Sequence, residues 1–206
     1  DYAEYDPSNP SDVSKASSLD ASDRKVLGSS MPTWYGGWNN TVSYKNFDLN
    51  VFFRFSGGNK IMNASRQSAL FNMDFSNNGT EILGRWISPE QPGDGMTPKI
   101  GYGDASSLFN DGYTDSHFVE SGNYLKLSTL ALGYTLPKAV VSKLNMTKIR
   151  FYVQGQNLLT ITGYSGLDPQ VRTDDGSGNS KDRNMGTDYG SYGMPRQFIL
   201  GVNVTF

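Results

Sequence analysis

The chain of 206 residues contains no cysteine and one histidine, and it has a formal net charge of −2. Without cysteine it forms neither disulfides nor cysteine-based metal sites, and the lack of a basic stripe argues against a nucleic-acid partner. Hydrophobic residues reach only 36%, whereas aromatic residues reach 13% and glycine contributes 23 residues. This balance is typical of strands and turns rather than of a helical bundle.

Residues 1–33 are dominated by Ser, Asp and Pro, which predicts a polar loop. The next residues predict a β-hairpin, with strands over 34–44 and 47–56 joined by the polar pair Lys45-Asn46. Along the second strand the odd positions are apolar and the even positions are mostly polar, which indicates a sheet with one apolar face. The apolar positions are Phe47, Leu49, Val51, Phe53 and Phe55.

Three further strands are expected over 118–136, 148–161 and 195–206, with long loops rich in turn-forming residues over 57–117 and 162–194. Irregular segments of such length are unusual inside a compact domain but ordinary in the outward loops of outer-membrane barrels. The connections between the five strands therefore alternate short, long, short, long. This alternation is typical of a barrel whose tight turns face one side of a membrane and whose long loops face the other.

The third strand contains a change of phase. Leu125 and Leu127 have the opposite parity to Leu130 and Leu132, and the change falls at Ser128-Thr129. This predicts a β-bulge or a strand section that lies outside the membrane.

In a barrel, aromatic residues are expected at both membrane interfaces. At the end with short, periplasmic turns these are Tyr44, Phe47, Tyr134 and Phe206, and toward the outer interface they are Trp34, Tyr35, Trp38, Phe53 and Phe55. The alternate polar residues are expected to face a water-filled lumen, because a charged lipid-facing residue costs about 2–4 kcal/mol at the midplane. They are Asp48, Asn50, Arg54, Arg150, Gln154 and Gln156.

By pattern alone, a soluble β-sandwich whose apolar face packs a core remains open. The long loops and a last strand that ends on Phe206 favour the barrel. Five strands do not close a barrel, and the strands over 34–44 and 195–206 would each leave an unpaired edge in lipid. We therefore expect an N-terminal part of the same protein to supply the remaining strands. The start at Asp1, without an initiator Met or a signal segment, gives the same expectation of a longer protein.

Several segments, in the same order along the chain, resemble the SusC/RagA family of TonB-dependent outer-membrane transporters. The first is Glu120-Ser121-Gly122-Asn123-Tyr124-Leu125-Lys126-Leu127, followed by Leu130-Ala131-Leu132-Gly133-Tyr134-Thr135-Leu136-Pro137. The second is Gly155-Gln156-Asn157-Leu158-Leu159-Thr160, followed by Tyr164-Ser165-Gly166-Leu167-Asp168-Pro169. Shorter matches include Asp23-Arg24, Arg85-Trp86, Pro195-Arg196 and the ending Gly201-Val202-Asn203-Val204-Thr205-Phe206. The resemblance covers nearly the whole chain from about residue 20.

The resemblance implies an all-β fold, a transmembrane antiparallel β-barrel of about 22 strands with long extracellular loops and short periplasmic turns. This chain would supply the C-terminal five strands, with residues 1–33 as an extracellular loop and the plug domain absent from it. The family further implies the bacterial outer membrane as location, a SusD-like surface lipoprotein as lid, and energy from TonB through the missing N-terminal region. Cargo in the family is glycans or peptides. No calcium site is carried over, because residues 6–12 lack the glycine of the family's calcium-loop-like stretch.

No catalytic, metal or cofactor site is assigned from the sequence. His117 is the only histidine, so we expect neither a catalytic triad nor a His-based metal cluster. We expect His117 to be an ordinary residue of a strand or a loop. The run Asp174-Asp175-Gly176-Ser177-Gly178-Asn179 resembles an oxygen-rich cation loop. It lacks the closing Glu of an EF-hand, which favours a solvated loop.

Loop tyrosines are weak candidates for ligand binding, since they can stack on sugars or pack against a lipoprotein lid. The alternative is that they pack the loops onto each other. They are Tyr102, Tyr113, Tyr164, Tyr189 and Tyr192. The leading hypothesis is therefore part of an importer and not an enzyme. The alternatives are a secreted β-rich carbohydrate-binding module that uses these tyrosines and, least favoured, a β-fold hydrolase.

Overall fold

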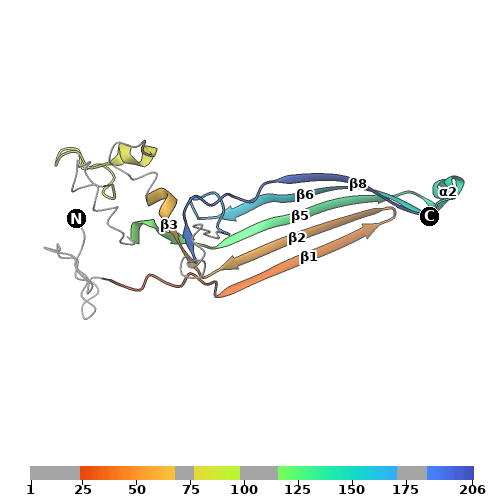
Figure 1. Ribbon diagram of the computed structural model, residues 1–206, viewed down its shortest axis with the longest axis horizontal. Helices are drawn as coiled ribbons and strands as arrows, with labels where there is room; N and C mark the ends of the chain where they lie inside the picture. The colour runs from red at the N-terminus through yellow and green to blue at the C-terminus, as the bar shows by residue number, and fades with distance from the viewer. Residues whose placement is uncertain (1–23, 68–76, 98–115, 171–184) are drawn as a thin grey trace, which may run out of the picture. The chain divides into compact units, whose positions relative to one another are not determined.

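Five antiparallel strands form the main sheet of the computed structural model, which describes residues 24–67, 77–97, 116–170 and 185–206 (Figure 1). They are β1 (Trp34–Tyr44), β2 (Phe47–Gly57), β5 (Tyr124–Thr135), β6 (Lys148–Thr162) and β8 (Gln197–Thr205). Their order across the sheet is β1-β2-β5-β6-β8, so each main strand lies beside the next one along the chain. β1 and β8 are the two edges.

Both short connections lie at one end of the sheet (Figure 1). A two-residue turn joins β1 to β2, with Tyr44 paired to Phe47 and Lys45 at a left-handed φ of 53°. A positive φ in a two-residue hairpin turn suits the right-handed twist of the strands. Between β5 and β6 the chain forms α2 (Lys138–Val141) and η5 (Ser142–Leu144).

A β-bulge corrects the phase of β5, which confirms the prediction drawn from its parity. The register shifts between Leu127 and Thr129 where β5 pairs with β2 and again where it pairs with β6. As a result Leu127 pairs with Phe53, and Leu130 pairs with Val51. Apolar side chains from both halves of β5 therefore share one face of the sheet.

The prediction of a single strand over 118–136 is wrong for the residues before β5. Residues Ser116–Phe118 form the short 3-10 helix η4, and Val119–Ser121 form a separate strand, β4. The break falls at Gly122, whose N–H donates to the carbonyl of Asn59 at 2.9 Å. A β carbon at Gly122 would overlap the Asn59 side chain, so this close approach requires glycine and ends the ladder before β5 begins.

Two short strands lie within segments expected to be loops, namely β3 (Lys60–Asn63) and β7 (Thr187–Asp188). With β4 they form a second sheet in the order β4-β3-β7. The contacts divide the chain into two units. Of the described residues, the smaller unit holds 24–28, 62–67, 77–97 and 116–119, and the larger unit holds 29–61, 120–170 and 185–206.

Few apolar side chains are buried among the described residues of either unit. In the smaller unit Phe118 is fully buried and packs with Met62 and with Ile82 of the 3-10 helix η3 (Thr80–Gly84). Buried apolar residues of the larger unit are Ile61, Ala131, Val141, Ile149 and Tyr164. Many large apolar side chains of the main sheet are exposed. Among the described residues, no helix has both the length and the apolar character to cross a membrane.

Candidate functional site

One face of the main sheet is apolar and open to its surroundings. The register aligns its residues across neighbouring strands, with Leu49 opposite Leu132, Leu132 opposite Val153, and Val153 opposite Leu200. In the middle of this face Leu132 is 45% exposed, Val153 42% and Leu200 83%. Monomeric soluble proteins rarely expose apolar patches beyond a few hundred Å², so an apolar face that continues across several strands marks a contact with a membrane or a partner.

Aromatic residues stand at both ends of the apolar face. Tyr44, Phe47, Tyr134 and Phe206 lie at the short-turn end. There the ring centroids of Phe47 and Tyr134 are 4.7 Å apart. Toward the opposite end Trp38 stacks on Phe53 with centroids 5.8 Å apart. Aromatic residues at both limits of an apolar band are typical of the interfacial girdles of outer-membrane barrels.

The opposite face of the main sheet is polar and hydrogen-bonded within itself. The Asn50 amide donates to the Asn39 side-chain oxygen at 2.8 Å and to the Thr41 hydroxyl at 2.9 Å. Arg150 reaches across β5 to the Asp48 carboxylate, with N–O distances of 2.5 and 2.9 Å. Charged and amide groups on an open face require water rather than lipid beside them.

Glycine makes room for this ion pair. Gly133 lies in β5 between Asp48 and Arg150, and a β carbon at Gly133 would overlap both the guanidinium and the carboxylate. Gly201 of β8 leaves similar space for the ring of Tyr152, its pairing partner in β6. The Arg150 guanidinium carbon lies 5.2 Å from the centroid of that ring. The side chains of Asp48, Arg150 and Tyr152, which pass over Gly133 and Gly201, thus form a continuous row of contacts from β2 to β8 on the polar face.

A buried ion pair joins the polar face to the loop between β6 and β8. Lys126 of β5 pairs with Arg54, so it belongs to the polar face, yet its side chain is only 1% exposed. Its ammonium donates to both Asp168 oxygens, at 2.8 and 3.1 Å, and to the Gln170 side-chain oxygen at 2.6 Å. The Gln170 amide in turn donates to the Tyr124 hydroxyl at 3.0 Å. We call Tyr124, Lys126, Asp168 and Gln170 the Lys126 cluster.

The Asp168 carboxyl is held in its charged form. Burial alone would raise its pKa, but the hydrogen bonds from Lys126 and from the backbone N–H groups of Gln170 and Met194 outweigh burial, so that the pKa of Asp168 lies below its usual range. The Asp168 carboxylate and the Lys126 ammonium therefore stabilise each other at a buried position where either charge alone would be unfavourable.

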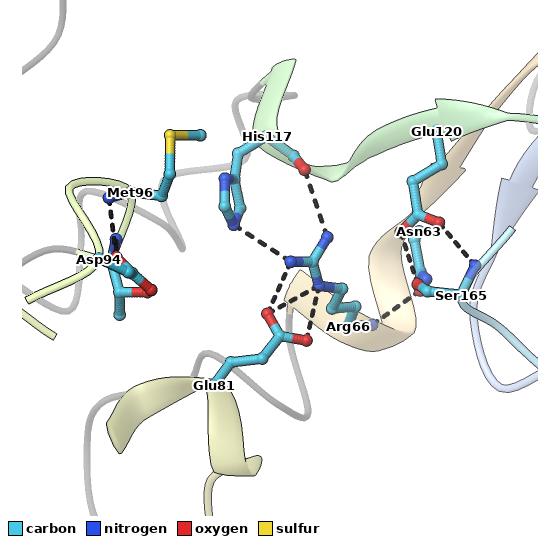
Figure 2. A network of polar contacts seen from close by, with 9 residues as sticks. Asn63, Arg66, Glu81, Asp94, Met96, His117, Glu120 and Ser165 are labelled. Carbon is cyan, nitrogen blue, oxygen red and sulfur yellow. Dashed lines mark hydrogen bonds and ion pairs between the residues drawn. The ribbon is translucent and has the colours of Figure 1, made fainter. Parts of the chain in front are cut away.

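Two further contacts hold the same loop. Tyr164 is buried and donates its hydroxyl to Asp188 at 2.5 Å, and burial together with this hydrogen bond raises the pKa of the phenol. Ser165 donates its N–H and its hydroxyl to Glu120, both at 2.7 Å (Figure 2). Glu120 and Lys126 lie in one family-like segment, and Ser165 and Asp168 lie in the other. The two segments that carry the resemblance therefore bind each other in the folded chain.

The candidate ligand tyrosines differ in position. Tyr164 is 5% exposed and its hydroxyl binds Asp188 within the loop, and its binding role stays a prediction. Tyr189 and Tyr192 are 65% and 97% exposed, and their binding role stays a prediction. Tyr102 and Tyr113 lie outside the described residues.

His117 belongs to a network centred on Arg66 in the smaller unit (Figure 2). The Arg66 guanidinium binds the Glu81 carboxylate, at 2.6 Å for the shortest N–O distance, and donates to the His117 carbonyl at 3.4 Å. Its Nη2 also lies 3.4 Å from His117 Nε2. Because arginine only donates, the imidazole nitrogen accepts in this contact. The part of the chain that the structure describes holds no group of three potential metal ligands, and the run 174–179 lies outside that part.

Sequence reasoning did not single out Lys126, Asp168 or Gln170. A lysine at a polar position of a strand gives no sign of burial, and its partner lies 42 residues further along the chain. The one available signal was that both segments belong to the same family pattern.

A sheet with one exposed apolar face, one polar face, aromatic ends and short turns at one end is typical of the wall of an outer-membrane β-barrel. The chain is homologous to TonB-dependent receptors. It is 32% identical over 188 residues to TonB-dependent receptor P3 of Formosa agariphila, which covers 91% of this chain and 18% of the receptor. It is 24% identical over 186 residues to TonB-dependent receptor SusC of Bacteroides thetaiotaomicron, covering 82% of this chain and 15% of SusC. No protein-family model matches the chain.

The fold is also that of a solved transporter. The structure of the RagAB peptide importer in its open-open state superimposes with a TM-score of 0.74 at 22% identity, over 100% of this chain and 20% of that one. The expected all-β fold, matching part of a transporter barrel, and the resemblance to the SusC/RagA type are thus confirmed. This chain spans at most about a fifth of the length of the relatives it matches.

Proposed function

We propose that this chain forms the C-terminal part of the transmembrane wall of a TonB-dependent importer in the bacterial outer membrane. The observation that carries the proposal is the division of the main sheet into an exposed apolar face and a polar, hydrogen-bonded face. Lipid contacts the first face, and a water-filled lumen lies beside the second. The homology to TonB-dependent receptors supports the direction of transport, into the cell.

The two edge strands support the existence of a larger barrel. Among the described residues, β1 and β8 each pair on one side only. An unpaired strand edge in lipid leaves backbone N–H and C=O groups without partners, at a cost of several kcal/mol for each group. Strands from an N-terminal part of the same protein close the barrel in this proposal. That part also carries the plug domain and the segment that meets TonB.

The cargo in this proposal is a glycan or a peptide, captured together with a SusD-like surface lipoprotein. RagAB is a peptide importer, which supports peptides, and the resemblance to the SusC/RagA family supports a lipoprotein lid above the long loops. The wall itself works passively, because it holds the pore open around the plug while the loops shape its outer mouth.

Neighbouring residues of β8 provide a direct test. In the full-length protein, Val202→Cys and Asn203→Cys place the same environment-sensitive fluorophore on the apolar and the polar face. We expect brominated phospholipids to quench the label at 202 and aqueous iodide to quench the label at 203. Quenching of both labels by iodide alone would contradict the proposal and would favour the secreted carbohydrate-binding module.

A further inference from the structure

We infer that the described parts of the loop between β6 and β8, residues 163–170 and 185–196, fold inward over the polar face, where Lys126 acts as a positioning residue that fixes them as part of the pore lining. This inference rests on the proposed function, since that function makes the polar face the lumen. The first observation is the burial of Lys126. Its neighbour Arg54, directly opposite on β2, is exposed, whereas Lys126 is 1% exposed because loop residues cover it.

Both arms of the loop meet at this point. Asp168 and Gln170 on the outgoing arm bind the Lys126 ammonium, and the N–H of Met194 on the returning arm donates to Asp168 at 3.2 Å. Asn157 of β6 also donates to the Pro195 carbonyl at 3.1 Å. A loop that projected away from the barrel would not bring both arms onto a lumen-facing side chain of β5.

The face that the loop covers is settled by strand parity. Tyr124 and Lys126 lie opposite Ser56 and Arg54 on the polar face. Leu125, between them, pairs with Phe55 on the apolar face. The Gln170 amide reaches the Tyr124 hydroxyl, so the loop lies on the lumen side of β5.

Contacts beyond the Lys126 cluster also anchor the described parts of this loop. Asp188 accepts from the Tyr164 hydroxyl at 2.5 Å and from the Ser191 N–H at 3.1 Å, and Glu120 holds Ser165. This framework fixes exposed side chains at the outer mouth, namely Leu167, Tyr189 and Tyr192. A cargo that enters the pore therefore passes aromatic and apolar groups whose positions depend on the Lys126–Asp168 ion pair.

Cysteine pairs that differ by one position in β5 test the inward fold. The full-length protein is prepared with Tyr124→Cys plus Gln170→Cys and, as a matched control, with Leu125→Cys plus Gln170→Cys. Each is treated with a short bismaleimide in the outer membrane and analysed by mass spectrometry of the cross-linked peptides. We expect the 124–170 link to exceed the 125–170 link at least tenfold. Equal yields, or a preference for 125, would overturn the inference.

Lysine labelling tests whether the Lys126–Asp168 ion pair keeps Lys126 covered. Lys60 is exposed and lies in the same unit as Lys126, so it reports the access of an amine-acetylating reagent. We expect acetylation of Lys126 to be at least tenfold lower than that of Lys60 in the parent protein and to approach that of Lys60 in Asp168→Ala. If Lys126 stays protected in Asp168→Ala, an element other than this loop covers it. If Lys126 and Lys60 are acetylated equally in the parent protein, Lys126 is not covered at all. Either result overturns the inference.

The two proposals fail separately. If the fluorophore at 202 reports water, the importer proposal fails whatever the cross-links show. If 202 reports lipid while Tyr124 and Gln170 do not cross-link, the importer proposal stands and the inward loop does not.

Discussion

An ion pair that crosses a β-strand needs a position without a side chain in that strand, and Gly133 is that position in β5. The Asp48 carboxylate and the Arg150 guanidinium meet over the backbone of β5, in the space that a side chain at 133 would occupy. The wide lumen of a barrel offers no opposing layer to pack against, so lateral contacts of this kind connect neighbouring strands on the polar face.

Gly133→Ala is expected to lower the stability of the full-length barrel by about 1–3 kcal/mol, because the added methyl group forces the ion pair apart or bends β5. The measurement is the temperature at which the folded, fast-migrating form is lost on semi-native electrophoresis. Gly163→Ala is the matched control, since a β carbon there meets nothing within 4 Å. Equal shifts for the two variants would contradict this role of Gly133.

Asp168 makes the Lys126 cluster sensitive to acid. Its pKa is lower in the folded chain than the value of about 3.9 expected when unfolded. Its contribution to stability is therefore fully present above about pH 4 and is lost as the pH falls through the lower, folded-state pKa. We expect the thermal midpoint of the parent protein to exceed that of Asp168→Asn at pH 5–7 and the difference to shrink below about pH 4. A difference that stays constant between pH 2.5 and 7 would show that the charge of Asp168 does not stabilise the loop.

At the scale of elements, the bulge between β5 and β6 gives a physical reason for the segment Gly155-Gln156-Asn157-Leu158. Thr129 pairs with Gln156 and Leu127 with Leu159, so β6 has one residue more than β5 across this interval. Asn157 takes a left-handed φ of 52° there. A β carbon at Gly155 would overlap the Leu158 side chain, so glycine at 155 lets that side chain fold back.

Asn157→Ala is expected to destabilise the barrel by about 1–2 kcal/mol, since alanine tolerates a left-handed backbone poorly. The variant also loses the hydrogen bond to the Pro195 carbonyl. Asn157→Gly loses the same bond but adopts the backbone without strain, so it serves as the control that separates the two effects. Thermal midpoints measured in detergent should fall more for alanine than for glycine. The reverse order would mean that the bulge does not depend on the left-handed residue.

Period-two alternation predicted the five main strands, the apolar face and the bulge in β5 from the sequence, because each of these depends on neighbours one or two residues apart. The break at Gly122 was missed, since it depends on a contact with Asn59, which is far away along the chain. The Lys126 cluster was missed for the same reason. Loop contacts between distant residues leave no periodic signal, and only the shared family pattern of the two segments indicated that they belong together.

For the whole molecule, the central claim is that lipid and water lie on opposite sides of one sheet, and adjacent residues of β6 can test it. Val153 lies on the apolar face between Leu132 and Leu200, whereas Gln154 lies on the polar face opposite Ala131. Val153→Arg should cost about 2–4 kcal/mol near the bilayer midplane, because the guanidinium must leave water. Gln154→Arg places the same group in the lumen and should be close to neutral.

The measurement for this pair is the amount of folded full-length protein in the outer membrane of expressing cells, compared with the parent. Val153→Arg should assemble poorly, while Gln154→Arg should match the parent. The two variants place the same arginine in the same strand, at neighbouring positions and therefore at nearly the same depth in the bilayer. A difference between them is therefore explained neither by general misfolding of β6 nor by the arginine itself. If both assemble equally well, the apolar face does not meet lipid, and a partner protein or a soluble core must cover it instead.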